Sequence, residues 1–183
     1  MKYLLGGEET SRLRFRTIEE TDFNDWLPFF EDPESFRYWN TKLESPKVEC
    51  LRWYDKQFGR YNHDNGGMNA LIEKSSDKLI GHCGLLIQHV DNVIELEIGY
   101  SLLRRFWNMG YASEAARKCR DVAFTHNYFP SLVSIINLAN TPSARVAIKN
   151  AMTIDKQTVY YENQVNIFRI TREKWASENE PTV

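Results

Sequence analysis

Hydrophobic residues recur along the chain at two spacings, one typical of strands and one typical of helices. Polar and apolar residues alternate over 12–18, which predicts a first strand. Apolar residues three or four positions apart then predict two helices. The first begins after Thr21 or Asp22, and the second begins at Ser45 and Pro46, where serine can cap the helix and proline can occupy its first turn.

Three predicted strands follow in close succession. They cover 68–73, 79–88 and 93–102, and short polar turns separate them. Turns this short can join only antiparallel neighbours, so the segment predicts an antiparallel meander. The third strand alternates cleanly between its two faces. Ile94, Leu96, Ile98 and Tyr100 share one face, and Glu95, Glu97 and Gly99 share the other.

The rest of the chain alternates between helix and strand. A helix over 110–127 has an apolar stripe opposite a charged side, and a buried strand follows over 132–138. Asn140 opens a short helix, and the last two strands, near 154–162 and 165–171, form a hairpin. The predicted order is β-α-α-β-β-β-α-β-α-β-β. This order indicates an α/β sandwich around a mixed, partly antiparallel sheet.

Composition and charge narrow the classes of function. The chain has 23 Lys and Arg against 25 Asp and Glu, a formal charge of −2, which argues against nucleic acid as the main partner. No apolar run approaches the roughly 20 residues that span a bilayer, and the N-terminal run is too short for a signal peptide. Cys50, Cys83 and Cys119 are far apart and lack metal-ligand spacing. We therefore expect no metal, no membrane partner, and a reducing cytoplasm.

The segment that follows the third meander strand carries the clearest candidate chemistry. A strand ends near Leu102, and the helix after it has the small residues Gly110 and Ala112 in or beside its first turn. Small residues let the backbone approach a ligand, and the free N–H groups of a first turn attract an anion such as a pyrophosphate. Arg104 and Arg105 can add positive charge. An ordinary helix start, packed tightly on a sheet, would show the same pattern.

Two motifs in this region resemble those of a known family. The first is Glu97-Ile98-Gly99-Tyr100 followed by Trp107-x-x-Gly110-Tyr111-Ala112-x-Glu114-Ala115, and the second is Asn140-x-x-Ser143-x-x-Val146-x-x-Lys149. In this order they resemble the acetyl-CoA signature of the GNAT superfamily of N-acetyltransferases. The resemblance is greatest to the branch of ribosomal-protein N-terminal acetyltransferases, and it covers about residues 12–172.

The resemblance implies a fold and a reaction. The fold is the GNAT-type sandwich, with a mixed, mostly antiparallel sheet of about seven strands, about four helices, and strands 4 and 5 splayed apart. The whole chain, 1–183, would form one N-acetyltransferase domain. Acetyl-CoA would be the cosubstrate, and a primary amine, on a protein N-terminus or on a small molecule, would attack it directly. A homodimer is compatible with this reading, and so is a CoA-binding regulator without turnover.

The resemblance also implies which residues bind acetyl-CoA. The pantetheine arm would bond to the backbone of Tyr100, Ser101, Leu102 and Leu103. The pyrophosphate would lie on the amides of Asn108, Met109, Gly110, Tyr111 and Ala112. Further cofactor candidates are Arg104, Arg105, Trp107, Asn140 and Ser143.

Amine acetylation requires a group that takes a proton from an ammonium. Glu97 is the first candidate, because its strand meets the acyl group in the resembled fold, and Glu95 is the second. Either carboxylate can instead be solvated or salt-bridged. Ser143 can protonate the leaving thiolate or can be a plain helix serine, and Asn140 can bond the pantetheine or cap its helix.

The aromatic segment 26–39 is the candidate acceptor region. It is more typical of a core, but Tyr38 and Trp39 are the residues in it that we expect to shape a substrate pocket. Glu31, Asp32 and Glu34 lie nearby, and a pocket rich in such acids would favour a small cation. A solvated helix end would place them there as well.

The chain departs from the family pattern at three places. Asn108 stands where glycine is common, and asparagine tolerates a positive φ. Ala151-Met152 replaces the usual Gly-Phe pair, so we expect the preceding helix to end differently, because alanine adopts the left-handed conformation less readily than glycine. Ala147 occupies the position where many relatives carry a general-acid tyrosine.

Overall fold

The computed structural model describes residues 2–39 and 44–179, so the two ends of the expected domain 1–183 lie outside the described residues. Within those ranges seven strands form one sheet in the order β1-β2-β3-β4-β5-β7-β6. The strands are β1 Leu13–Arg16, β2 Gly66–Glu73, β3 Lys78–Val90, β4 Val93–Leu102, β5 Ser131–Asn137, β6 Thr153–Tyr160 and β7 Asn163–Thr171. The α-helices are α1 Phe23–Glu31, α2 Pro33–Phe36, α3 Pro46–Asn62, α4 Tyr111–Thr125, α5 Thr141–Lys149 and α6 Arg172–Asn179.

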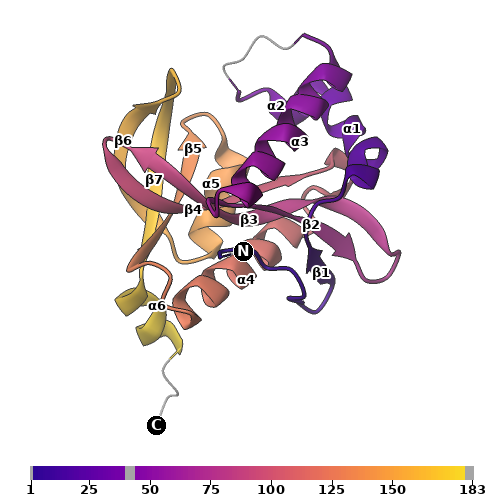
Figure 1. Ribbon diagram of the computed structural model, residues 1–183. Helices are drawn as coiled ribbons and strands as arrows, with labels where there is room; N and C mark the ends of the chain where they lie inside the picture. The colour runs from indigo at the N-terminus through magenta and orange to yellow at the C-terminus, as the bar shows by residue number, and fades with distance from the viewer. Residues whose placement is uncertain (1, 40–43, 180–183) are drawn as a thin grey trace.

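The helices cover both faces of the sheet. Figure 1 shows α1, α2 and α3 together on one side and α4 on the other. The four predicted helices correspond to α1, α3, α4 and α5. The short helices α2 and α6 were not predicted, because their apolar residues do not recur at helical spacing. The predicted α/β sandwich around a mixed sheet is therefore confirmed. In the described part of the chain, no helix is long and apolar enough to cross a membrane.

The central meander β2-β3-β4 is antiparallel, as predicted. Asp91 and Asn92 both have positive φ, 50° and 65°, which is the two-residue turn that matches the twist of a hairpin. Strand β2 begins at Gly66, two residues before the predicted start, and it lies so close to β3 there that a Cβ at Gly66 would be 2.0 Å from the carbonyl oxygen of Leu85. The last hairpin turns at residues 161–162, slightly earlier than predicted.

Strands β4 and β5 are parallel neighbours that meet over a very short length. Their recorded pairing is the single pair Glu97 and Val133, whereas β5 pairs with β7 along its whole length. The Ser134 hydroxyl adds one link by donating a hydrogen bond of 2.9 Å to the carbonyl oxygen of Ile98. The predicted separation of the fourth and fifth strands therefore begins just after Glu97.

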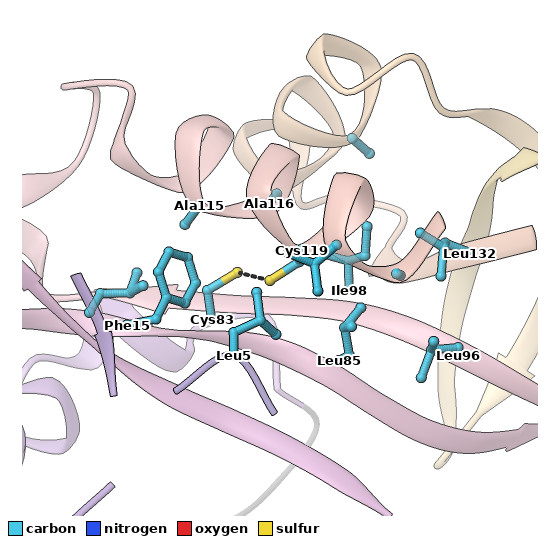
Figure 2. Close-up of a cluster of buried hydrophobic side chains, with 14 of the residues drawn as sticks. Leu5, Phe15, Cys83, Leu85, Leu96, Ile98, Ala115, Ala116, Cys119 and Leu132 are labelled. Carbon is cyan, nitrogen blue, oxygen red and sulfur yellow. Dashed lines mark hydrogen bonds between the residues drawn. The ribbon is translucent and has the colours of Figure 1, made fainter. Parts of the chain in front are cut away.

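The main core lies between the sheet and α4. Figure 2 shows leucine and isoleucine side chains of the strands facing small residues of α4, which let the helix lie close to the sheet. Cys83 and Cys119 meet there with their sulfur atoms 3.5 Å apart, and both are fully buried free thiols. Burial raises the pKa of Cys119 well above its ordinary value, so it remains a protonated core residue.

Helix α5 ends in the left-handed turn in which glycine is common, but the left-handed residue here is Ala151. Ala151 has φ of 63°, and its N–H donates to Ile148 while the N–H of Met152 donates to Ala147. These two bonds form the motif that commonly ends a helix at a left-handed glycine. The expectation that alanine would change this ending was wrong. The two hydrogen bonds and the burial of Met152 outweigh the cost of the left-handed alanine.

Replacing Ala151 with glycine is expected to stabilise the protein. Glycine relieves the strain of the left-handed conformation, but it also raises the conformational entropy of the unfolded chain. The net effect should be a free energy of unfolding that is higher by about 1 kcal/mol. For a chain of this size that corresponds to a melting temperature about 2–4 °C higher, measurable by calorimetry. Ala144→Gly, inside the same helix, is the matched control and should lower the melting temperature. A fall with both variants would contradict the strain argument.

Candidate active site

A cavity of about 670 Å³ opens where β4 and β5 separate. Its wall combines Glu97 and Tyr100 of β4, residues of β5, the start of α5, one face of α3, and the tip of the β6–β7 hairpin. This volume is in the range of small-molecule sites. The strand separation therefore creates a space that joins the sheet to both helical layers.

Glu97 lies at the point where the two strands part. Its Oε2 accepts a hydrogen bond of 2.6 Å from Gln88 Nε2, and the backbone N–H of Ile135 also donates to the carboxylate. Burial raises the pKa of Glu97 above its ordinary value, although both hydrogen bonds oppose this shift. A carboxyl group with a raised pKa is a better proton acceptor near neutral pH than an exposed glutamate.

The orientation of Gln88 is fixed by its other partners. Its Oε1 accepts hydrogen bonds of 3.0 Å from the hydroxyl of Tyr160 and 3.0 Å from Arg60 Nη2. Two donors on the oxygen leave Nε2 to face Glu97. The network thus holds the Glu97 side chain in one position at the cavity wall.

Glu95 has a different environment. Arg169 donates two hydrogen bonds to it, of 2.6 and 3.0 Å, and also bonds Asp155 at 2.9 Å. Glu95 is buried and is not among the residues that line the cavity. It therefore has the salt-bridged role that the sequence left open as an alternative, whereas Glu97 borders the cavity.

The N-terminus of α4 is open to solvent. Gly110 is the N-cap residue with φ of 84°, and Asn108 also has a positive φ of 59°, as its tolerance for that region suggested. No side chain of the described residues caps the helix, so the free N–H groups of its first turn remain available to an anion. Together with exposed Met109, and with Tyr111 and Ala112 just inside the helix, these residues form the predicted pyrophosphate loop.

Arg12 holds this loop in place from the N-terminal segment. Its Nη1 donates to the carbonyl oxygen of Met109 at 2.9 Å, and its guanidinium lies 4.2 Å from the ring centre of Tyr111. Glu114, in the first turn of α4, accepts from Arg12 Nε at 2.7 Å. The glutamate of the motif therefore anchors the loop.

The other predicted cofactor residues divide into three environments. Leu102 and Leu103 are buried, the Leu102 carbonyl accepts from Trp107 Nε1 at 2.8 Å, and the Leu103 N–H donates to Ile80 at 3.0 Å. Ser101 pairs with β3, next to Tyr100 at the cavity. Arg104 and Arg105 are exposed beside the loop, and Arg104 forms an ion pair of 3.3 Å with Asp32.

Asn140 and Ser143 lie at the start of α5 and line the cavity. Asn140 Oδ1 accepts from the N–H of Ser143 at 3.1 Å, so Asn140 caps the helix. The Tyr100 hydroxyl donates to the carbonyl oxygen of Ser143 at 2.8 Å. These contacts fix β4 to α5 across the end of the cavity, and the buried Ala147 follows one turn later.

Tyr38 and Trp39 also line the cavity, on the side of α1 and α2. Trp39 packs against Phe29 and Phe30, and the carbonyl oxygen of Tyr38 accepts from Asn137 at 3.4 Å. The nearby acids do not reach this space. Asp32 caps α2 and pairs with Arg104, Glu34 pairs with Arg37, and neither these two nor Glu31 is a lining residue.

Sequence reasoning missed several polar residues of the cavity. Gln88 and Tyr160 reach it through the register of the sheet, which strand patterns alone do not reveal. The charged residues of α3 did leave a signal, because they recur every three or four positions along one face of that helix. That face resembles a solvated surface, but it borders the cavity. Its charged members are Glu49, Arg52, Lys56 and Arg60.

His82 is enclosed in the core on the α1 and α3 side. It is fully buried, its ring centre lies 4.3 Å from that of Trp26 and 4.6 Å from that of Trp53, and it does not line the cavity. Burial lowers its pKa to about 3, so it stays neutral at ordinary pH. Across the described residues, no group of three or more His, Cys, Asp or Glu is placed to hold a metal ion.

The sequence was also compared with known proteins. The family model described as Acetyltransferase (GNAT) domain matches residues 12–153. The chain belongs to the GNAT acetyltransferase family. The resemblance seen in the two sequence motifs is thereby confirmed, and acetyl transfer is the chemistry of the family.

Individual relatives cover most of this GNAT chain. YkkB of Bacillus subtilis (strain 168), an uncharacterized protein, is 29% identical over 163 residues, which are 87% of this chain and 92% of YkkB. The uncharacterized N-acetyltransferase p20 of Bacillus licheniformis is 30% identical over 148 residues, 81% of this chain and 82% of p20. The crystal structure of an acetyltransferase from Agrobacterium tumefaciens str. C58 has the same fold, with a TM-score of 0.76 at 23% identity, covering 93% of this chain and 96% of that chain.

Proposed function

We propose that this GNAT acetyltransferase transfers an acetyl group from acetyl-CoA to a primary amine by direct attack. The observation that carries the proposal is the position of Glu97. It lies where β4 and β5 part, at the wall of the cavity, with its pKa raised by burial. In this proposal Glu97 is the proton acceptor, and the acyl group lies beside it, as the family resemblance implies.

The residues present suit acetyl-CoA as the cosubstrate. An uncapped helix N-terminus with a glycine in the left-handed conformation offers amide N–H groups to a pyrophosphate, and Arg104 and Arg105 stand beside it. Two proteins of the same fold support this choice. RimL, a ribosomal L7/L12 alpha-N-protein acetyltransferase, was solved in complex with coenzyme A, and MccE was solved in complex with acetyl-CoA and AMP.

Glu97 acts in this proposal as the general base. It removes a proton from the substrate ammonium, directly or through a water, and the neutral amine then attacks the carbonyl carbon of the thioester. A backbone N–H near residues 98–100 bonds the oxyanion, as the family resemblance implies. The carbonyl then re-forms and the C–S bond breaks. Ser143, at the edge of the cavity, relays the extra proton of the acylated nitrogen to the leaving thiolate and ends as a neutral hydroxyl, and the proton taken by Glu97 is released to solvent.

The proposal also covers the setting of the reaction. We take the whole chain as one catalytic domain that works in the cytoplasm. Three buried free cysteines are in keeping with a reducing compartment. Tyr38 and Trp39 form the acceptor side of the cavity in this reading.

The test combines binding with turnover. Saturating acetyl-CoA should raise the melting temperature, because a ligand that binds only the native state stabilises it, and NAD should leave it unchanged. Free-thiol release from acetyl-CoA across a panel of peptides and small amines should then detect transfer. An unmoved melting curve would contradict the cosubstrate. A shift without thiol release from any amine would instead indicate a CoA-binding regulator.

A further inference from the structure

The charges around the cavity do not balance. Among the residues that the structure describes, three cations and two carboxylates line it: Arg52, Lys56, Arg60, Glu49 and Glu97. Arg52 forms an ion pair of 2.8 Å with Glu49, and it also forms an ion pair with Glu44. These pairs leave two cations, Lys56 and Arg60, facing one carboxylate, Glu97.

Neither of these cations has a carboxylate partner within the structure's described ranges. Arg60 donates to Gln88 Oε1 and to the backbone oxygens of Ile87 and Asn65, all of which are uncharged groups. No carboxylate of the described residues lies within ion-pair distance of Lys56. The Lys56 side chain still reaches solvent, but partial desolvation at the cavity wall lowers its pKa, and the nearby Arg60 lowers it further, while Glu97 opposes both effects. A negative group in the cavity would relieve both effects.

The position of these cations separates them from the pyrophosphate loop. Lys56 and Arg60 are on α3, and Figure 1 shows α3 and α4 on opposite sides of the sheet. The pyrophosphate site of the proposed function is the N-terminus of α4. The cations of α3 are therefore on the acceptor side of the cavity. An anion that binds them would belong to the acceptor and not to the pyrophosphate.

The acidic residues near the cavity that could attract a polycation form ion pairs outside it. Asp32 and Glu34 are engaged by Arg104 and Arg37 outside the cavity. Glu97 alone is a carboxylate at the cavity that no described cation binds as an ion pair. A polyamine would therefore place its second ammonium close to Lys56 and Arg60, which repel it.

Aromatic rings supply the rest of the acceptor wall. Phe30, Trp39 and Trp53 line one side, and Tyr160 and Tyr161 of the hairpin line the other. The rings of the two tyrosines are 4.6 Å apart, and Trp39 is 42% exposed. Such a surface suits a flat or apolar side chain.

We propose that the acceptor is a small primary amine that also carries an anionic group, a carboxylate or a phosphoryl group, and an apolar side chain. Lys56 binds the anion, with Arg60 adding to the field, and the amine is left beside Glu97. This inference rests on the proposed function, because it identifies the acceptor of the same reaction.

The experiment compares acceptors that differ only in the anion. Phenylalanine carries a carboxylate, its phosphonate analogue 1-amino-2-phenylethylphosphonate carries a phosphonate, and phenethylamine has the same ring and amine without an anionic group. Spermidine represents a polycation. Thiol release from acetyl-CoA gives kcat/KM for each, and calorimetry with CoA present measures the binding of both anionic amines without turnover.

We expect at least one of the two anionic amines to exceed phenethylamine and spermidine by roughly tenfold or more in kcat/KM, the usual range for one charge-assisted hydrogen bond. Lys56→Gln should remove that advantage, mainly through KM, and should therefore lower kcat/KM much more for the anionic amines than for phenethylamine. A smaller change common to all acceptors is expected, because the Lys56 charge lowers the pKa of Glu97. Lys56→Arg should keep most of it. Lys47→Gln, the same change on an exposed residue of α3 that does not line the cavity, is the matched control.

Three results overturn the inference: equal or better use of phenethylamine or spermidine, an equal effect of Lys56→Gln on acceptors with and without an anionic group, or no binding of either anionic amine. The proposed function survives each of them as long as acetyl-CoA raises the melting temperature and some amine releases thiol. If acetyl-CoA neither binds nor reacts with any amine, the proposed function fails, and this inference fails with it.

Discussion

Replacing Glu97 with glutamine is expected to lower turnover by roughly 10²–10⁴-fold at neutral pH, the usual contribution of a positioned general base. Glutamine keeps the shape of the side chain and can still accept a hydrogen bond from Gln88, but it cannot take a proton. Acetyl-CoA binding should be unchanged, because the proposed pyrophosphate site lies on α4. Steady-state thiol release and an acetyl-CoA titration measure the two effects separately.

The pH dependence gives this prediction a second readout. Because burial raises the pKa of Glu97, the wild-type rate should rise with pH as that carboxyl loses its proton. The glutamine variant should instead gain rate only at higher pH, where more of the amine is already neutral. A wild-type rate that falls as pH rises through the acidic range would contradict the assignment.

Stability separates a lost base from a damaged fold. A carboxyl whose pKa is raised in the folded state binds more protons there than in the unfolded chain, between the unfolded and the folded pKa. The free energy of unfolding therefore falls as pH rises through that window. Glu97→Gln removes this cost and should leave the protein at least as stable at neutral pH.

Glu95→Gln is the matched control on the same strand. It breaks the buried pair with Arg169, so it should lower the melting temperature, while the chemical step should change little. If Glu95→Gln abolishes turnover in a folded protein and Glu97→Gln does not, the base is Glu95. If neither change slows the chemical step, the proposed mechanism is wrong.

Local sequence patterns predicted those helices and strands whose structure depends on residues close together in the chain. The alternation of apolar and polar residues over 93–102 coincides with β4, because one face packs against the core under α4 and the other does not. The proline at the start of α3 and the Asn140 cap of α5 mark where those helices begin, since each acts within one turn.

The cavity depends on contacts between distant segments, and the sequence alone does not specify them. Gln88 meets Glu97 because of the register between β3 and β4, and Ile135 reaches the same carboxylate from β5. The pairing of Glu95 with Arg169 joins two strands that are far apart in the chain. Alternation placed both glutamates on one face, but only the tertiary neighbours distinguish a buried ion pair from a cavity carboxylate.

Gly110→Asp is expected to lower the affinity for CoA by roughly 100-fold or more. The new carboxylate would lie against the phosphates of CoA, and such a contact between like charges costs several kcal/mol. Gly110 is the N-cap of α4, where the proposed pyrophosphate meets the free amides of the first turn. An aspartate there would both occupy the helix N-terminus and repel the phosphates.

The fold should tolerate this change. A Cβ at position 110 would lie 3.4 Å from Arg12 Nη2, a flexible side-chain end that can move, and Arg12 can pair with the new carboxylate. Gly110 has φ of 84°, and aspartate adopts a positive φ more readily than most residues, so the backbone strain costs only about 1 kcal/mol. The melting temperature without ligand should therefore change little, which calorimetry can confirm before any binding is measured.

Gly110→Asn is the matched control, because asparagine has nearly the same shape, tolerates a positive φ and carries no charge. It should retain much more CoA affinity than Gly110→Asp, and the difference should shrink as salt screens the repulsion. Isothermal titration of both variants with CoA at low and high ionic strength measures this. Equal affinities for the two folded variants would mean that no phosphate binds at this helix N-terminus, and the cosubstrate would have to bind elsewhere on the protein.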